Sequence, residues 1–264
     1  MPDPQPDETV LAARLGPVVT LTLNRPQALN SFTTALHAQL LAALNAAADD
    51  TTVRCVVITG AGRGFCAGQD LADPSAAPGQ DLGALIDRHY RPLVERLQSM
   101  PVPVIAAVNG VAAGAGANLA LNCDLVLAAR SASFIQAFAK IGLLPDTGGT
   151  WLLPRLVGRQ RALGLALLGD KLSADEAERF GLIWKCVDDA ALADTVAALA
   201  QRLAAMPTRA LVATRAAIDA AQHLTLDEAL AGEAAAQRRL GAGHDFLEGV
   251  AAFGAKRTPV FTDR

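Results

Sequence analysis

The sequence contains a single tyrosine, Tyr90, in 264 residues. Short-chain dehydrogenases need a tyrosine followed by a lysine four residues later, and Val94 occupies that spacing here. The glycine turn over 59–64 follows an apolar run, as a dinucleotide-binding turn does, but the residues from Phe65 to Asp70 do not have a helical pattern. Both absences argue against a nicotinamide-dependent enzyme.

Two other common catalytic patterns are missing. No G-x-S-x-G elbow is present, which argues against the serine nucleophile of α/β-hydrolases. The histidines form no HExxH pair and lie far apart in the sequence, so we predict no metal site and interpret each as a surface or capping residue. They are His37, His89, His223 and His244. The sequence leaves open the role of His89, which follows a glycine- and proline-rich segment over 72–80 that we expect to be a loop.

Cysteine pairs, basic clusters and targeting segments are also lacking. The four cysteines, without a CxxC motif, predict buried thiols in a reducing compartment. They are Cys55, Cys66, Cys123 and Cys186. A net charge of −3 without a basic cluster argues against a nucleic-acid partner. The acidic, proline-rich segment over 1–8 has neither signal-peptide nor transit-peptide character. The uncharged segment over 97–123 is interrupted by proline and asparagine, so we predict a buried strand–turn–helix instead of a membrane span, and a cytoplasmic protein.

The chain has enough apolar residues, 52% against 19% charged residues, to form a sizeable core. Its patterns predict strands over 18–23, 53–59, 104–108 and 124–129, and helices over 33–48, 82–98 and 152–168, the last with a break near Gly158. A capping box begins at Ser173, and from about 190 to 253 the pattern is helical throughout. We therefore predict an α/β core over residues 1–200 and a helical C-terminal region over 201–264.

Two glycine-rich segments, over 60–70 and 109–121, each follow an apolar strand. Glycine allows the backbone to approach a neighbour closely, and the start of a helix leaves unpaired N–H groups with partial positive charge. Two such donors that converge on one point would form an oxyanion hole. Close packing of helix against strand, without a ligand, is the alternative for either segment alone.

Asp146 stands among apolar residues and glycines in the segment over 142–150. Desolvation in such surroundings raises the pKa of a carboxyl group and makes it a better proton carrier near neutral pH. The alternative is an N-cap for the helix that contains Trp151.

Four ordered motifs resemble those of the crotonase superfamily, the enoyl-CoA hydratases and isomerases. They lie over 25–30, 64–71, 109–124 and 142–150, and the resemblance extends from about Thr9 to Phe261. It implies a spiral of ββα units and a helical C-terminal region that forms trimers, often paired into hexamers. It also implies an acyl-CoA thioester substrate, in which CoA is part of the substrate and no separate cofactor is needed.

The resemblance also implies site residues by position. The N–H groups of Ala67 and Ala115 would hold the thioester oxygen. The residues that would contact CoA within the same subunit are Arg25, Ala28, Leu29, Ala67, Gly68, Gln69 and Asp70. Phe253 and Lys256 match positions that reach CoA from a neighbouring subunit.

The sequence departs from typical hydratases of the superfamily at the two glutamates that activate water, where it has Asn118 and Phe138. Neither can act as a general base at neutral pH, so Asp146 is the remaining candidate. The segments over 62–71, 108–117 and 151–155 resemble those of the 1,2-epoxyphenylacetyl-CoA isomerases, which convert the ring epoxide to oxepin-CoA and also shift double bonds in enoyl-CoAs. An enoyl-CoA hydratase, a Δ3,Δ2-enoyl-CoA isomerase of fatty-acid oxidation and a non-catalytic acyl-CoA-binding subunit are the alternatives. The sequence does not identify the acyl group of the substrate, although residues 72–90 are expected to line its pocket.

Overall fold

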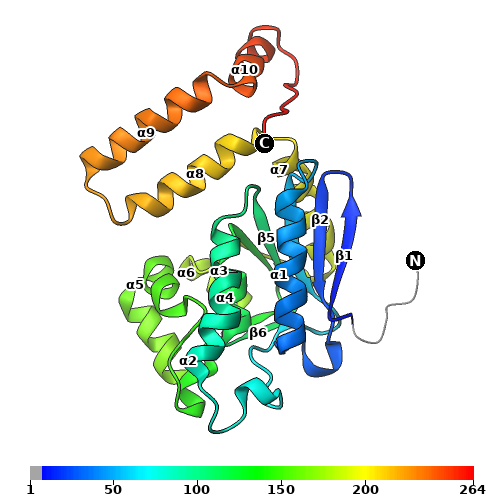
Figure 1. The fold of residues 1–264 in the computed structure, drawn as a ribbon, viewed down its shortest axis with the longest axis vertical. Helices are drawn as coiled ribbons and strands as arrows, with labels where there is room; N and C mark the ends of the chain where they lie inside the picture. The colour runs from blue at the N-terminus through cyan, green and yellow to red at the C-terminus, as the bar shows by residue number, and fades with distance from the viewer. Residues whose placement is uncertain (1–7) are drawn as a thin grey trace.

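A computed structural model describes residues 8–264 (Figure 1). Most of the acidic N-terminal segment over 1–8, which we predicted to be no targeting peptide, lies outside the described residues. The described chain forms two β-sheets with helices packed around and between them, and three further helices at its C-terminal end.

The larger sheet has six strands in the order β1-β2-β3-β5-β7-β10. Their bounds are Val10–Leu15, Val18–Leu23, Cys55–Gly60, Val104–Val108, Leu125–Ala129 and Lys185–Val187. β1 is antiparallel to β2, and every other neighbouring pair is parallel. Parallel strands are covered on both faces and therefore have continuous apolar sequences, and all five residues of β5 are buried.

The smaller sheet has four strands in the order β4-β6-β8-β9, with bounds Gly64–Cys66, Val111–Ala113, Ser133–Ile135 and Lys171–Ser173. β4, β6 and β8 each follow directly on a strand of the larger sheet, namely β3, β5 and β7. Helical segments follow each of these pairs, so the chain repeats a ββα unit and the predicted crotonase-like spiral is confirmed. The sequence analysis missed the short strands of this smaller sheet.

Seven α-helices belong to the described core: α1 Thr34–Asp49, α2 Leu82–Leu85, α3 Arg91–Gln98, α4 Ala115–Leu121, α5 Gly149–Leu168, α6 Ala174–Phe180 and α7 Leu192–Ala204. A π-helical turn, Ile86–Tyr90, joins α2 to α3, so the helix predicted over 82–98 is present with an irregular centre. The capping box at Ser173 and the break at Gly158, where φ is 75°, are confirmed. α4 contacts strands of both sheets, and all its residues are buried.

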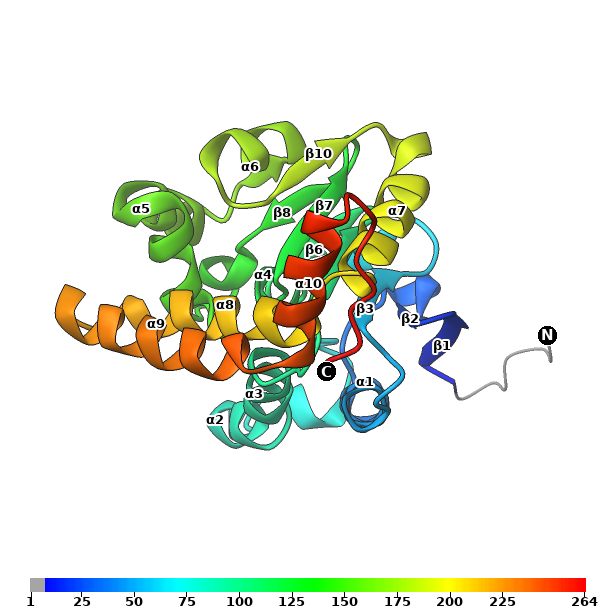
Figure 2. The ribbon, with the colours of Figure 1, turned by 90° about the horizontal axis from the view of Figure 1, so that it is seen from above.

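Three helices, α8 Thr208–Ala221, α9 Leu226–Gly241 and α10 His244–Gly254, follow α7 and extend from one end of the core. α8 and α9 run side by side in both views (Figures 1 and 2). Large apolar side chains on α10 are exposed, including Phe246, Leu247, Val250 and Phe253. The helical character predicted beyond residue 190 is confirmed, while the domain boundary at residue 200 stays a prediction.

The four cysteines are buried and form no disulfide, as the sequence analysis expected. Within residues 8–264, none of the helices combines the length and apolar character that a membrane crossing requires.

Candidate active site

The turn between β3 and β4 is held by asparagine side chains. Asn30, which is fully buried, donates from Nδ2 to the carbonyl oxygens of Ala61 (2.9 Å) and Gly64 (2.8 Å). Asn109 donates from Nδ2 to the Gly62 carbonyl at 2.9 Å. A strand follows Gly64 where a dinucleotide-binding turn would open a helix. The exclusion of a dinucleotide site at this turn therefore agrees with the structure.

The two glycine-rich segments pack directly against each other. Gly68 has a φ of 90°, and a Cβ atom there would lie 2.9 Å from the Ala113 carbonyl oxygen and 3.4 Å from the Ala115 nitrogen. A Cβ atom at Gly116 would lie 2.2 Å from the Cys66 carbonyl oxygen. Glycine is therefore required at both positions, because the backbones approach too closely for any side chain.

The two N–H groups that we predicted to hold the thioester oxygen, those of Ala67 and Ala115, differ in whether the protein already provides an acceptor for them. The Ala67 N–H donates to the Leu29 carbonyl oxygen at 3.0 Å, so it already has a partner and is not available to a substrate oxygen. The prediction for Ala67 is therefore wrong in this respect, because a contact from a distant segment of the chain occupies the donor. The N–H groups of Gln69 and Ala115 have no acceptor within residues 8–264. Ala115 is the first residue of α4, where the positive end of the helix lies.

A cavity of about 650 Å³ joins both segments to the loop that carries Asp146. Ala67, Gly68, Gln69, Ala115 and Asp146 all line it, so the structure brings together these five predicted residues. Apolar side chains form much of its remaining wall, among them Leu82, Leu85, Ile86, Tyr90, Phe138 and Leu144. Several of these come from residues 72–90, the segment expected to line the acyl pocket.

Asp146 does not cap a helix. α5 begins at Gly149, and its N-cap residue is Gly148, which makes no side-chain capping bond. The alternative interpretation of Asp146 as an N-cap is therefore wrong. Its carboxylate accepts a hydrogen bond from Thr147 Oγ1 at 2.8 Å. Burial raises the pKa of Asp146 above its ordinary value, and the Thr147 hydrogen bond opposes this shift. A raised pKa makes a carboxylate a stronger base and so a better proton acceptor.

The two positions where hydratases have glutamate are filled differently. Asn118 is fully buried and donates from Nδ2 to the Asp146 carbonyl oxygen at 2.8 Å. Phe138 is buried and lines the cavity, and its Cζ atom would lie 3.7 Å from a Cβ atom at Gly114. Among the described residues that line the cavity, Asp146 is the one carboxylate.

The other predicted CoA-contacting residues lie outside this cavity wall. The Arg25 guanidinium is held by the Asp70 carboxylate at 2.9 Å and the Ser31 carbonyl oxygen at 2.7 Å. Leu29 follows the short helical turn that contains Ala28 and has a φ of 49°. Phe253, on α10, lines a separate cavity beside α8, and Lys256 follows α10. Roles in CoA binding stay predictions for all these residues.

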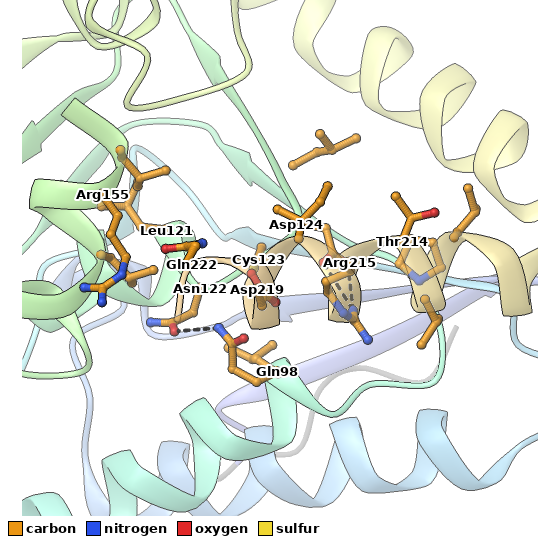
Figure 3. A pocket seen from close by; sticks show the side chains of 18 of the residues that line it. Gln98, Leu121, Asn122, Cys123, Asp124, Arg155, Thr214, Arg215, Asp219 and Gln222 are labelled. Atoms are coloured by element: carbon orange, nitrogen blue, oxygen red, sulfur yellow. Dashed lines mark hydrogen bonds and ion pairs between the residues drawn. The ribbon is translucent and has the colours of Figure 1, made fainter. Parts of the chain in front are cut away.

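A second cavity, of about 430 Å³, lies between the core and α8 (Figure 3). Its charged centre is the ion pair of Arg215 with Asp124, whose nearest atoms are 3.0 Å apart, and Arg215 also donates to the Met100 carbonyl oxygen. The Arg215–Asp124 pair satisfies its own charges, and none of the predicted site residues lines this cavity, whereas the larger cavity contains Asp146 and two N–H donors without acceptors among the described residues. The larger cavity is therefore the better candidate for chemistry.

Sequence reasoning missed an aromatic cluster behind this site. His37 is buried, so its interpretation as a surface or capping histidine is wrong. Its ring centroid lies 4.4 Å from that of Phe32, 4.3 Å from Tyr90 and 5.3 Å from His89. The Tyr90 hydroxyl donates to Gln69 Oε1 at 2.8 Å and so reaches the first glycine-rich segment. The contact between His37 and Tyr90 joins α1 to the π-helical turn Ile86–Tyr90, about 50 residues later, and no local sequence pattern could reveal it.

Comparison with known proteins agrees with this fold. Residues 14–264 match the family described as enoyl-CoA hydratase/isomerase. The 1,2-epoxyphenylacetyl-CoA isomerase of Escherichia coli is 56% identical over 94% of this chain and 95% of that protein. The 2,3-dehydroadipyl-CoA hydratase of E. coli is 38% identical over 97% of this chain and 99% of that protein. An enoyl-CoA hydratase from Bacillus anthracis superposes with a TM-score of 0.90 at 32% identity, covering 97% of this chain and 100% of that structure.

These matches span nearly the entire chain and include both its sheets and its C-terminal helices. The chain therefore belongs to the enoyl-CoA hydratase/isomerase family, the crotonase superfamily.

Proposed function

We propose that this chain is an acyl-CoA isomerase that converts 1,2-epoxyphenylacetyl-CoA to oxepin-CoA and also moves double bonds in enoyl-CoAs. The observation that carries the proposal is the single carboxylate, Asp146, in a cavity lined by two N–H donors without protein acceptors. A lone carboxylate suits a reaction that relocates a proton, in which no water is added. The 56% identity to an isomerase with this named substrate supports the choice.

In the proposed mechanism, the N–H groups of Gln69 and Ala115 hold the thioester oxygen, with Gln69 replacing Ala67 as the first donor. Asp146 takes a proton from the carbon beside the thioester, and the negative charge moves onto the held oxygen as an enolate. One such donor typically contributes about 3 kcal/mol to transition-state stability. In the epoxide, the electrons assist opening of the carbon–oxygen bond and ring expansion. The carboxyl group then returns its proton to a different carbon of the same substrate, so substrate and product have the same atoms.

The proposed assembly is a trimer or hexamer in the cytoplasm. Support comes from the exposed apolar side chains of α10, since contiguous exposed apolar surface commonly marks an interface. In such an assembly Phe253 and Lys256 would reach CoA bound to a neighbouring subunit.

The central test is Asp146→Asn, which keeps the shape of the side chain and removes its ability to carry a proton. We expect turnover of the epoxide ester and of a 3-enoyl-CoA to fall by about 10²- to 10⁴-fold, while binding of an unreactive CoA ester persists. Turnover would be followed by chromatography of the products, and binding by calorimetry. Turnover at the wild-type rate would remove Asp146 from the mechanism.

The same product analysis separates the alternatives. A hydratase would convert a 2-enoyl-CoA to a 3-hydroxyacyl-CoA, and we expect no such product, because Asn118 and Phe138 carry no carboxylate. A plain Δ3,Δ2-enoyl-CoA isomerase would leave the epoxide unchanged. A non-catalytic binding subunit would bind the esters and convert none of them.

A further inference from the structure

Two asparagines on one face of α4 hold the loop that carries Asp146. Asn118 and Asn122 are four residues apart and therefore project from the same side of the helix. Asn118 Nδ2 donates to the Asp146 carbonyl oxygen at 2.8 Å, and Asn122 Nδ2 donates to the Thr147 carbonyl oxygen at 2.9 Å. Both side chains are buried. Two successive carbonyl groups of the loop are thus fixed to one rigid helix.

A third side chain fixes the orientation of the Asn118 amide. The Asp146 carbonyl oxygen can only accept, so the Asn118 atom that faces it must be nitrogen. The other Asn118 atom is then an acceptor, and Gln136 Nε2 donates to it at 2.8 Å. Gln136 is 3% exposed and follows β8, and its Oε1 has no hydrogen-bond partner within residues 8–264, so the bond to Asn118 is the one that its side chain makes there. The amide of Asn118 consequently has one orientation.

The local backbone gives a reason why the loop needs this support. Thr147 has a φ of 52°, a left-handed conformation that a β-branched residue rarely adopts. Gly149 donates its N–H to the Asp146 carbonyl oxygen at 2.7 Å and leaves space for Asn118. A Cβ atom at residue 149 would lie 2.3 Å from Asn118 Nδ2. The loop that carries Asp146 and the Asn118 amide therefore pack closely, with no space for a side chain at residue 149.

We propose that Asn118, oriented by Gln136, is the positioning residue for Asp146: it fixes the main chain of residue 146 so that the carboxylate stays on the cavity. This inference rests on the proposed function, since it assigns Asn118 a role in the same proton transfer. The positioning role also explains why residue 118 is an asparagine. A neutral amide donates to the loop without placing a second negative charge beside Asp146, whereas a carboxylate at position 118 would repel the carbonyl oxygen and the Asp146 carboxylate alike.

The first test is Asn118→Asp, which keeps the size of the side chain, removes the donor and adds a negative charge. We expect kcat to fall by about 10- to 100-fold while KM changes by less than about 3-fold, because misplacement of a reacting group lowers the rate more than it lowers binding. The acid limb of the pH profile of kcat/KM should also move to higher pH. Tyr90 and Lys140 line the same cavity, and neither is altered in this variant.

Two further variants separate positioning from folding. Gln136→Leu leaves Asn118 in place but removes the bond that orients it, so kcat should fall by a smaller factor, about 3- to 10-fold, without movement of the acid limb. Asn24→Asp is a matched control, because Asn24 also donates from Nδ2 to a main-chain carbonyl, that of Glu8 at 3.0 Å. We expect wild-type kcat for this control. Carboxyl carbon NMR of Asp146 should show a higher pKa in Asn118→Asp than in the wild type.

The outcomes distinguish this inference from the proposed function. Wild-type kcat and an unchanged pH profile in folded Asn118→Asp and Gln136→Leu proteins, together with an inactive Asp146→Asn protein, would overturn the positioning role and leave the isomerase proposal intact. Should Asn118→Asp fail to fold, Gln136→Leu decides, and wild-type kcat there overturns the inference. Full activity of Asp146→Asn would overturn both.

Discussion

The imidazole of His37 stacks with the rings of Phe32 and His89 and meets the Tyr90 ring edge to face. Burial lowers its pKa from 6.5 to about 4, and the nearby His89 adds to this shift. In the unfolded chain the same histidine takes up a proton near its ordinary pKa. The folded protein therefore binds fewer protons than the unfolded protein between about pH 6.5 and pH 4, and its stability falls as the pH falls through that range.

At the residue scale we expect the free energy of unfolding to decrease by on the order of 3 kcal/mol over this pH range through His37. His37→Phe, which keeps an aromatic ring in the stack, should reduce the decrease. Urea unfolding at a series of pH values would measure it. His223 is exposed, so His223→Phe serves as the control and should retain the wild-type pH dependence. An unchanged dependence in His37→Phe would assign the effect to other groups.

At the element scale, the contact between α4 and the first glycine-rich segment leaves no space for a side chain at Gly116. A side chain at Gly116 would enter the space of the Cys66 carbonyl group, which cannot move away as a flexible side chain would. The same contact sets where the Ala115 N–H lies, because Ala115 and Gly116 share the first turn of α4. Packing and site geometry are therefore linked at this helix end.

We expect Gly116→Ala to lower the free energy of unfolding by about 1–3 kcal/mol and to reduce turnover, because the inserted methyl group must displace backbone. Gly164→Ala is the matched control, since a Cβ atom there, on the exposed side of α5, meets no atom within 4 Å. That substitution should stabilise the protein by about 0.5–1 kcal/mol through the better helix propensity of alanine. Thermal and urea denaturation would compare the two. Equal stability of both variants would contradict the close contact.

The long elements of the core were predictable from sequence, and the short ones were not. α1, β2 and β3 have clear apolar patterns and lie within two residues of their predicted bounds. The strands of the smaller sheet have three residues each, too few for any periodicity, and pairing across the sheet defines them.

The residues of the candidate site also divide into those that the sequence predicts and those that it does not. Asp146 was named from local context and Ala115 from the family resemblance, whereas the partner of the Ala67 N–H is a carbonyl 38 residues earlier, at Leu29, which local patterns do not specify.

On the scale of the whole molecule, the C-terminal helices leave apolar surface uncovered. Phe253 is 89% exposed and Leu247 is 62% exposed, both on α10. We expect the double substitution Leu247→Glu and Phe253→Glu to shift the proposed trimer or hexamer toward monomer, because charged side chains would have to be desolvated in the interface. Light scattering after gel filtration would report the mass. A control pair, Leu15→Glu and Leu71→Glu, alters residues of similar exposure in the core and should leave the mass unchanged.

The burial of all four cysteines has a practical consequence for labelling. Desolvation raises the pKa of each thiol, to about 12 for Cys55 and Cys66, so the folded protein presents little thiolate to maleimide reagents at neutral pH. One added thiol on the outer wall of the larger cavity, through Leu144→Cys, would then be modified selectively, since Leu144 is 70% exposed. A fluorophore attached there would sit beside the larger cavity in an otherwise unmodified protein and could report ligand binding directly.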